Sequence, residues 1–103
     1  MSAEVPIACS LDAGALTDRF DEWRALVASS VTSLVAEPTV LHLVLDPTDA
    51  ALVAAVALAQ REVQCCPFFG VAVLIGADHR TLSLSVPDGA EEAMATFVAA
   101  LTP

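Results

Sequence analysis

The residues best suited to chemistry lie in one short segment, EVQCCPFF, which spans residues 62–69. Glu62 precedes Cys65 by three positions and Cys66 by four, and residues at these separations are neighbours on a helix surface. One carboxylate and two thiols can therefore approach the same point. Thiolates prefer soft or borderline ions such as Zn²⁺, Cu(I), Hg²⁺ and As(III). The segment thus indicates a site for a thiophilic metal or metalloid.

A third thiol, Cys9, lies in a segment that the sequence predicts to be a short strand. If that strand lies beside the one after Cys66, the three thiols form one site, and Glu62 or His42 completes a tetrahedron for zinc. The spacing matches neither a zinc finger nor a paired C-x-x-C ribbon. The predicted metal ligands are therefore Cys9, Cys65, Cys66 and Glu62, and no organic cofactor is expected.

The position of the adjacent cysteines helps to separate metal binding from redox chemistry. Cys65 and Cys66 precede Pro67 at the end of a predicted helix, where the helix dipole is negative. That end disfavours a reactive thiolate and favours a bound cation, although Arg61 opposes this effect. Adjacent cysteines also make a poor disulfide. A redox sensor is therefore the less favoured use of these thiols.

All three cysteines also admit a simpler interpretation as small buried hydrophobic residues. Cys66 fits it well because it lies on an apolar helical stripe with Val63 and Ala59, whereas Cys65 lies off that stripe. Of the other polar candidates, His42 is expected to be a hydrogen-bonded structural histidine. We expect His79 to be a solvated loop residue, and Arg19 with Glu22 to be a solvated ion pair. Trp23 is expected to be an aromatic residue of the core.

Length and composition limit the class of protein. A chain of 103 residues predicts a single domain over 1–103, and 56% hydrophobic with 17% charged residues excludes a disordered chain. The formal net charge is −9, with four arginines and no lysine, which argues against nucleic acid and anionic membranes as partners. No signal peptide and no membrane-spanning apolar run are evident, so a cytoplasmic protein is expected.

The helices and strands that must position the thiols can be predicted from residues that start or end such elements and from the periodicity of apolar residues. A strand is predicted at 7–11, then one amphipathic helix from Asp12 whose apolar positions recur at steps of three and four as far as Leu34. The rest of the chain predicts a strand at 39–45, a helix started by the DPTD of residues 46–49, a hairpin of strands 68–75 and 81–86, and a final helix with a capping box from Asp88 to Glu91. The order β-α-β-α-β-β-α predicts an α+β two-layer sandwich, with three helices and a four-stranded mixed sheet.

Four segments in this order resemble a known group: IACSL at 7–11, RFDEWRAL at 19–26, EVQCCPFF at 62–69 and VPDGA at 86–90. The group consists of small uncharacterised actinobacterial proteins, which are similar to the C-terminal extension domain of MerR-family, heavy-metal-type regulators. The resemblance implies a domain that senses or holds a soft metal, with Cys9, Glu62, Cys65 and Cys66 as its natural ligands. It does not imply DNA binding, because the winged-helix part of such regulators is absent here.

These observations favour a cytoplasmic binding module for Hg, As(III), Zn or Cu(I). One alternative is a small structural or interaction domain, a homodimer that uses the apolar strand 68–75 and buries inert cysteines. Another is an enzyme that resembles an organomercurial lyase, in which thiolates hold mercury and Glu62 protonates the carbon. The enzyme is less favoured because so short a chain leaves little room for a substrate pocket.

Overall fold

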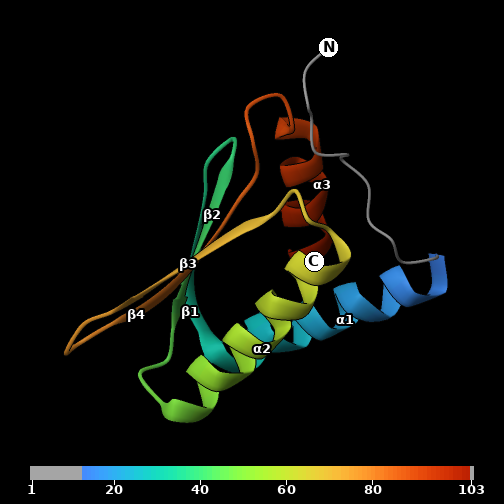
Figure 1. Cartoon of the computed structure of the whole chain (residues 1–103). Helices are drawn as coiled ribbons and strands as arrows, with labels where there is room; N and C mark the ends of the chain where they lie inside the picture. The colour runs from blue at the N-terminus through green and yellow to red at the C-terminus, as the bar shows by residue number, and fades with distance from the viewer. Residues whose placement is uncertain (1–12, 103) are drawn as a thin grey trace.

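The computed structural model describes residues 13–102, so the expected strand at 7–11, which carries Cys9, lies outside the described residues. Seven elements follow in order: α1 (Ala13–Ser30), β1 (Val31–Ala36), β2 (Val40–Leu45), α2 (Asp49–Cys65), β3 (Gly70–Ile75), β4 (Arg80–Ser85) and α3 (Glu91–Leu101). Figure 1 shows the helices gathered against one face of the sheet. The α+β class, with three helices and a four-stranded sheet in this part of the chain, is confirmed.

The sheet has the strand order β1-β2-β4-β3, and every pairing between these strands is antiparallel. The prediction of a mixed sheet is therefore wrong for the described strands. The reason is that both outer pairs are hairpins with short connections, which force antiparallel pairing. Within residues 13–102 the order is α-β-β-α-β-β-α, where α-β-α-β-β-α was expected. The fourth strand comes from residues that the sequence assigned to the end of the first helix.

That first helix ends at Ser30, and β1 occupies the positions where the helical stripe was expected to continue. A β-bulge between Val31 and Ser33 explains the error. The bulge leaves Thr32 as an extra residue, so Val31 and Leu34 face the same side of the sheet although they are three positions apart. Three-residue spacing is normally a helical signal, and the bulge reproduces it in a strand.

The core lies between the helices and the two central strands. Alternate residues of β2 and β4 point toward the helices and are almost fully buried: Leu41, Leu43, Leu45, Leu82 and Leu84. The residues between them, such as His42 and Ser83, lie on the opposite face. Three helices supply the other side of the core, and the largest side chain there is Trp23, which is fully buried. None of the helices at 13–102 combines the length and apolar character needed to cross a bilayer.

The helix caps differ in detail from the sequence prediction. The N-cap of α2 is Thr48, whose hydroxyl accepts a hydrogen bond from the Ala51 N–H at 3.1 Å. The prediction that the DPTD of residues 46–49 starts this helix is confirmed, and its third residue is the cap. The predicted capping box at Asp88 is wrong, because α3 begins after Ala90 and has no side-chain cap. Gly89 adopts a φ of 94°, which turns the chain into α3 and leaves Asp88 outside the helix.

Replacing Thr48 with alanine is expected to lower the free energy of unfolding by about 1 kcal/mol, because it removes the acceptor for one N-terminal N–H of α2. The matched variant is Asp46→Ala, at the first residue of the same DPTD segment. Chemical denaturation of both variants measures the difference. Equal losses in the two variants would contradict the assignment of Thr48 as the cap.

Candidate functional site

The polar cluster in the helix layer is built from two residues of α1 and two of α2. Arg19 and Trp23 are four positions apart on α1, and Glu62 and Cys65 are three apart on α2. Residues at these separations share a helix face, and α1 packs against α2. The packing therefore brings a guanidinium, an indole, a carboxylate and a thiol to one place. We call these four residues the Arg19–Glu62 cluster.

Glu62 lies at the centre of this cluster and is only 3% exposed. Its Oε1 accepts a hydrogen bond from Trp23 Nε1 at 2.7 Å and lies 3.5 Å from Arg19 Nη1. Glu62 is buried because α2 turns a stripe made mainly of alanines toward the core, at Ala51, Ala55, Leu58 and Ala59, and Glu62 continues that stripe. A buried carboxylate requires such donors, because an unpaired charge in an apolar layer is costly.

Cys65 is the half-buried thiol of the cluster. Arg19 Nη2 lies 3.5 Å from its Sγ, so the same guanidinium contacts both the sulfur and the carboxylate of Glu62. Burial of Arg19 lowers its pKa. The hydrogen bond to Cys65, the charges of Glu62 and Cys65 and the hydrogen bond to Glu62 outweigh that effect, and the net pKa is raised above the ordinary value. Arg19 is thus a fixed cation at the end of α2.

Cys66 is a member of the hydrophobic core and is 2% exposed, whereas Cys65 is partly buried at the edge of that core. Its placement agrees with the interpretation of Cys66 as a small core residue. Neither Cys65 nor Cys66 is in a disulfide. Among residues 13–102, no three histidine, cysteine, aspartate or glutamate side chains are grouped closely enough to hold a metal ion. A three-thiol site with Cys9 stays a prediction, because Cys9 lies outside the described residues.

His42 does not belong to this site. It lies on the face of the sheet away from the helices, where Nδ1 is 2.7 Å from Ser83 Oγ and Nε2 is 3.1 Å from Glu37 Oε2. The expectation of a hydrogen-bonded structural histidine is confirmed. Its suggested role as a fourth metal ligand with Cys65 is wrong, because the sheet separates the two side chains.

Sequence reasoning missed Arg19 as a site residue. It expected a solvated pair with Glu22, but Arg19 is only 8% exposed, and Glu22 lies 3.9 Å from its Nε at the rim. The prediction that Trp23 is a core residue is confirmed, but its hydrogen bond to Glu62 was not foreseen. The sequence signal that could have identified Arg19 was its spacing from other residues of α1. Arg19 precedes Trp23 by four positions and Leu26 by seven, and both of these are buried, so all three share the inner face of α1.

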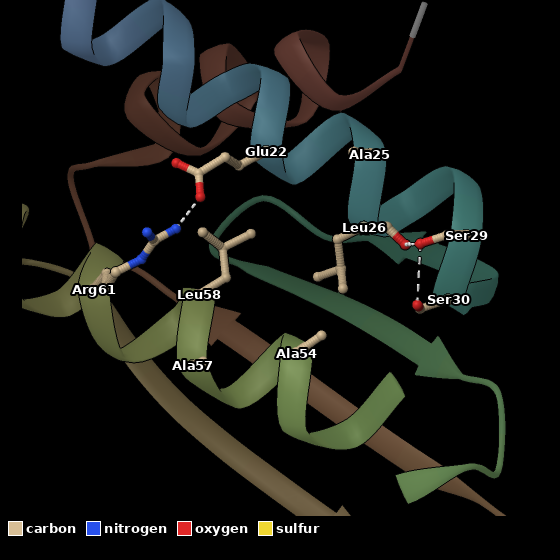
Figure 2. Close-up of a pocket in the computed structure, with 9 residues that line it drawn as sticks. All are labelled: Glu22, Ala25, Leu26, Ser29, Ser30, Ala54, Ala57, Leu58 and Arg61. Atoms are coloured by element: carbon tan, nitrogen blue, oxygen red, sulfur yellow. Dashed lines mark hydrogen bonds and ion pairs between the residues drawn. The ribbon is translucent and has the colours of Figure 1, made fainter. Parts of the chain in front are cut away.

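A groove of about 570 Å³ runs along the α1–α2 junction beside the cluster. In Figure 2, Glu22 and Arg61 face each other across one end of this groove and form an ion pair. Its walls are mainly the small or apolar side chains of Ala25, Leu26, Ala54, Ala57 and Leu58, with Ser29 and Ser30 at the other end. Because Glu22 also lies 3.9 Å from Arg19 Nε, this exposed pair is a direct neighbour of the Arg19–Glu62 cluster.

Comparison with known proteins gave no match to a family model, to a curated protein or to a solved structure.

Proposed function

We propose that this chain is a cytoplasmic module that binds a soft, thiophilic metal or metalloid ion, with Cys65 as the first ligand. The observation that carries the proposal is the position of Arg19, whose guanidinium is held between the sulfur of Cys65 and the carboxylate of Glu62. Cys66 and Cys9 are the further thiols. Glu62 lies next to the ligands and orients the guanidinium.

The charge of Arg19 suits thiolate chemistry. Metals bind the thiolate form of cysteine, and the Arg19 guanidinium, 3.5 Å from the Cys65 sulfur, can pair with a metal–thiolate complex that carries negative charge. Two thiolates neutralise Hg²⁺ and three neutralise As(III), while a third thiolate on Hg²⁺ gives an anionic complex. Arg19 therefore faces a neutral or negative complex rather than a bare cation. Hard ions such as Mg²⁺ and Ca²⁺ prefer oxygen ligands and gain nothing from this arrangement.

The two adjacent thiols have different accessibility, which orders the binding steps. Cys65 is half-buried and contacts Arg19, whereas Cys66 lies in the core just after α2 ends. A thiophilic ion therefore reaches Cys65 first. Cys66 lies deeper, in the core, so we expect its binding to the same ion to require a rearrangement of the turn at residues 66–69. Binding of a second thiol is thus expected to change the packing around Phe69, which belongs to the same core.

Titration of the fully reduced protein with Hg²⁺, As(III) and Zn²⁺ tests this proposal through the ultraviolet thiolate-to-metal band. Cys65→Ser is expected to weaken Hg²⁺ or As(III) binding at least about tenfold, because a hydroxyl is a poor ligand for soft ions. Cys66→Ser and Cys9→Ser are expected to lower the number of thiols consumed by one each.

The matched control compares two arginines of α1. Arg19→Met should weaken binding, whereas Arg24→Met should not, because Arg24 contacts Asp21 and the Ala100 carbonyl at a distance from the thiols. Unchanged affinity in Cys65→Ser would overturn the proposal and return the cysteines to a core role. Phenylmercury serves as an additional ligand, because release of benzene would favour the lyase-like alternative.

A further inference from the structure

Three side chains on the face of the sheet away from the helices form a continuous hydrogen-bonded chain. His42 of β2 and Ser83 of β4 are direct partners in the antiparallel ladder, and His42 Nδ1 lies 2.7 Å from Ser83 Oγ. On the other side of the ring, Nε2 lies 3.1 Å from Oε2 of Glu37, which follows β1. A hydroxyl, an imidazole and a carboxylate in this order are the parts of a nucleophile that a general base activates.

The carboxylate of Glu37 decides where the protons of this chain lie. An ionised carboxylate can only accept hydrogen bonds, so His42 carries a proton on Nε2 and donates it to Glu37. In a neutral imidazole with Nε2 protonated, Nδ1 is an acceptor, and the hydroxyl of Ser83 is its donor. The Ser83 proton therefore points at a base that can take it as Oγ attacks an electrophile.

The fold holds Ser83 firmly and leaves it within reach of small molecules. β4 lies between β2 and β3, and Ser83 is the ladder partner of His42 on one side and of Ala72 on the other. The small side chain of Ala72 leaves room beside the hydroxyl. The described helices lie against the opposite face of the sheet (Figure 1), and the side chains of His42 and Glu37 are 34% and 57% exposed.

The same strand pairing limits the class of substrate. β4 is a central strand, so its backbone N–H groups are used in the ladders with β2 and β3 and do not form an oxyanion hole beside Ser83. An ester with a poor leaving group needs such a hole, whereas an ester activated by a phenolate leaving group depends on it less. The net charge of −9 also repels anionic acyl donors. The arrangement thus suits a neutral, activated ester.

We propose that Ser83 is a nucleophile that accepts an acyl group from neutral, activated esters, with His42 as its general base and Glu37 as the residue that positions the base. Ser83 Oγ forms a bond to the carbonyl carbon, its proton passes to His42 Nδ1, and the bond to the leaving phenolate breaks, which takes up that proton. Water then attacks the acyl-serine and gives a proton to Nδ1, and this proton returns to Ser83 Oγ as the carboxylic acid departs. The reaction is independent of metal binding, because none of these residues belongs to the Arg19–Glu62 cluster.

Reaction of the reduced protein with p-nitrophenyl acetate tests the proposal. The wild-type chain is expected to release p-nitrophenolate and to carry an acetyl group on Ser83, which peptide mass spectrometry locates. Thiols also react with this ester, so the rate is measured from the acetylated Ser83 peptide and not from total phenolate. Ser83→Ala should remove that product. His42→Gln should slow acetylation of Ser83 at least about 100-fold, the lower end of what general-base catalysis contributes.

Ser85 provides the matched control, because it lies on the same face of β4 and pairs with Val40 rather than with His42. Ser85→Ala should leave acetylation of Ser83 unchanged. NMR of the His42 ring nitrogens adds a readout for Glu37: the wild type should show the tautomer with Nε2 protonated, and Glu37→Gln should show a mixture of tautomers and slower acetylation. Acetylation of Ser83 no faster than that of Ser85, or unchanged in His42→Gln, would overturn the proposal.

Discussion

Replacing Glu62 with alanine is expected to lower the free energy of unfolding by about 3–5 kcal/mol. Its carboxylate is the acceptor for Trp23 Nε1 and the charge partner of Arg19, and all three side chains are buried. Removing it leaves a guanidinium in an apolar layer without its carboxylate, and an indole N–H without its acceptor. The loss of unfolding free energy therefore comes from leaving two buried donors unsatisfied, and not from the attraction within one ion pair.

Urea denaturation of Glu62→Ala and Glu22→Ala measures this effect. Glu22 also pairs with arginines of α1 and α2, but its side chain is 45% exposed, so its loss should cost less than about 1 kcal/mol. Glu62→Gln keeps an acceptor for Trp23 and loses the charge, so an intermediate value is expected. Similar losses for Glu62→Ala and Glu22→Ala would show that the buried network does not stabilise the helix layer.

Replacing Trp23 with alanine is expected to cost about 3–5 kcal/mol of unfolding free energy, because it opens a large cavity in the core. Trp23 is fully buried, and its ring meets Phe97 of α3 edge to face, with centroids 5.4 Å apart. It also donates to Glu62. The side chain therefore connects α1 both to α2 and to α3, and its removal should loosen all three helices.

Two variants separate these contributions. Trp23→Phe keeps an aromatic ring and removes the N–H donor. In addition to any cost of repacking, the missing hydrogen bond should lower the free energy of unfolding by about 1–3 kcal/mol. Phe20→Ala removes a half-buried ring of the same helix, whose centroid lies 6.3 Å from that of Phe97, and should cost less than Trp23→Ala. Thermal unfolding followed by circular dichroism gives the ranking. A larger loss for Phe20→Ala would contradict the central place of Trp23.

Much of the fold could be predicted from the sequence because its signals are local. The strand at 39–45 and the hairpin at 68–86 correspond to β2 and to β3 with β4, and Pro67 follows the end of α2 as expected. The error at β1 arose because a bulge gives a strand the spacing of a helix. The antiparallel pairing of β3 with β4 was predicted correctly, but the mixed sheet was wrong, because the pairing of the other strands depends on contacts that periodicity does not report.

The candidate site was predicted only in part. Glu62 and Cys65 do share a helix face, and the spacing argument explains why. It failed for Cys66, which turns into the core where α2 ends, and it could not find Arg19. An arginine with a glutamate three positions later has the pattern of a solvated pair. Its burial depends on α2 presenting a carboxylate opposite it, and that is a property of tertiary packing.

The strand order also bears on how the chain reaches this structure. Each hairpin, β1 with β2 and β3 with β4, closes across a short connection and can form from nearby residues. Only the ladder between β2 and β4 joins them, and it must bring together residues separated by the whole segment 46–79. Closing that segment costs chain entropy, and this cost precedes the stabilising contact between paired residues such as Leu43 and Leu82. We therefore expect the formation of this ladder, which docks two units that are each a helix followed by a hairpin, to limit the rate of folding.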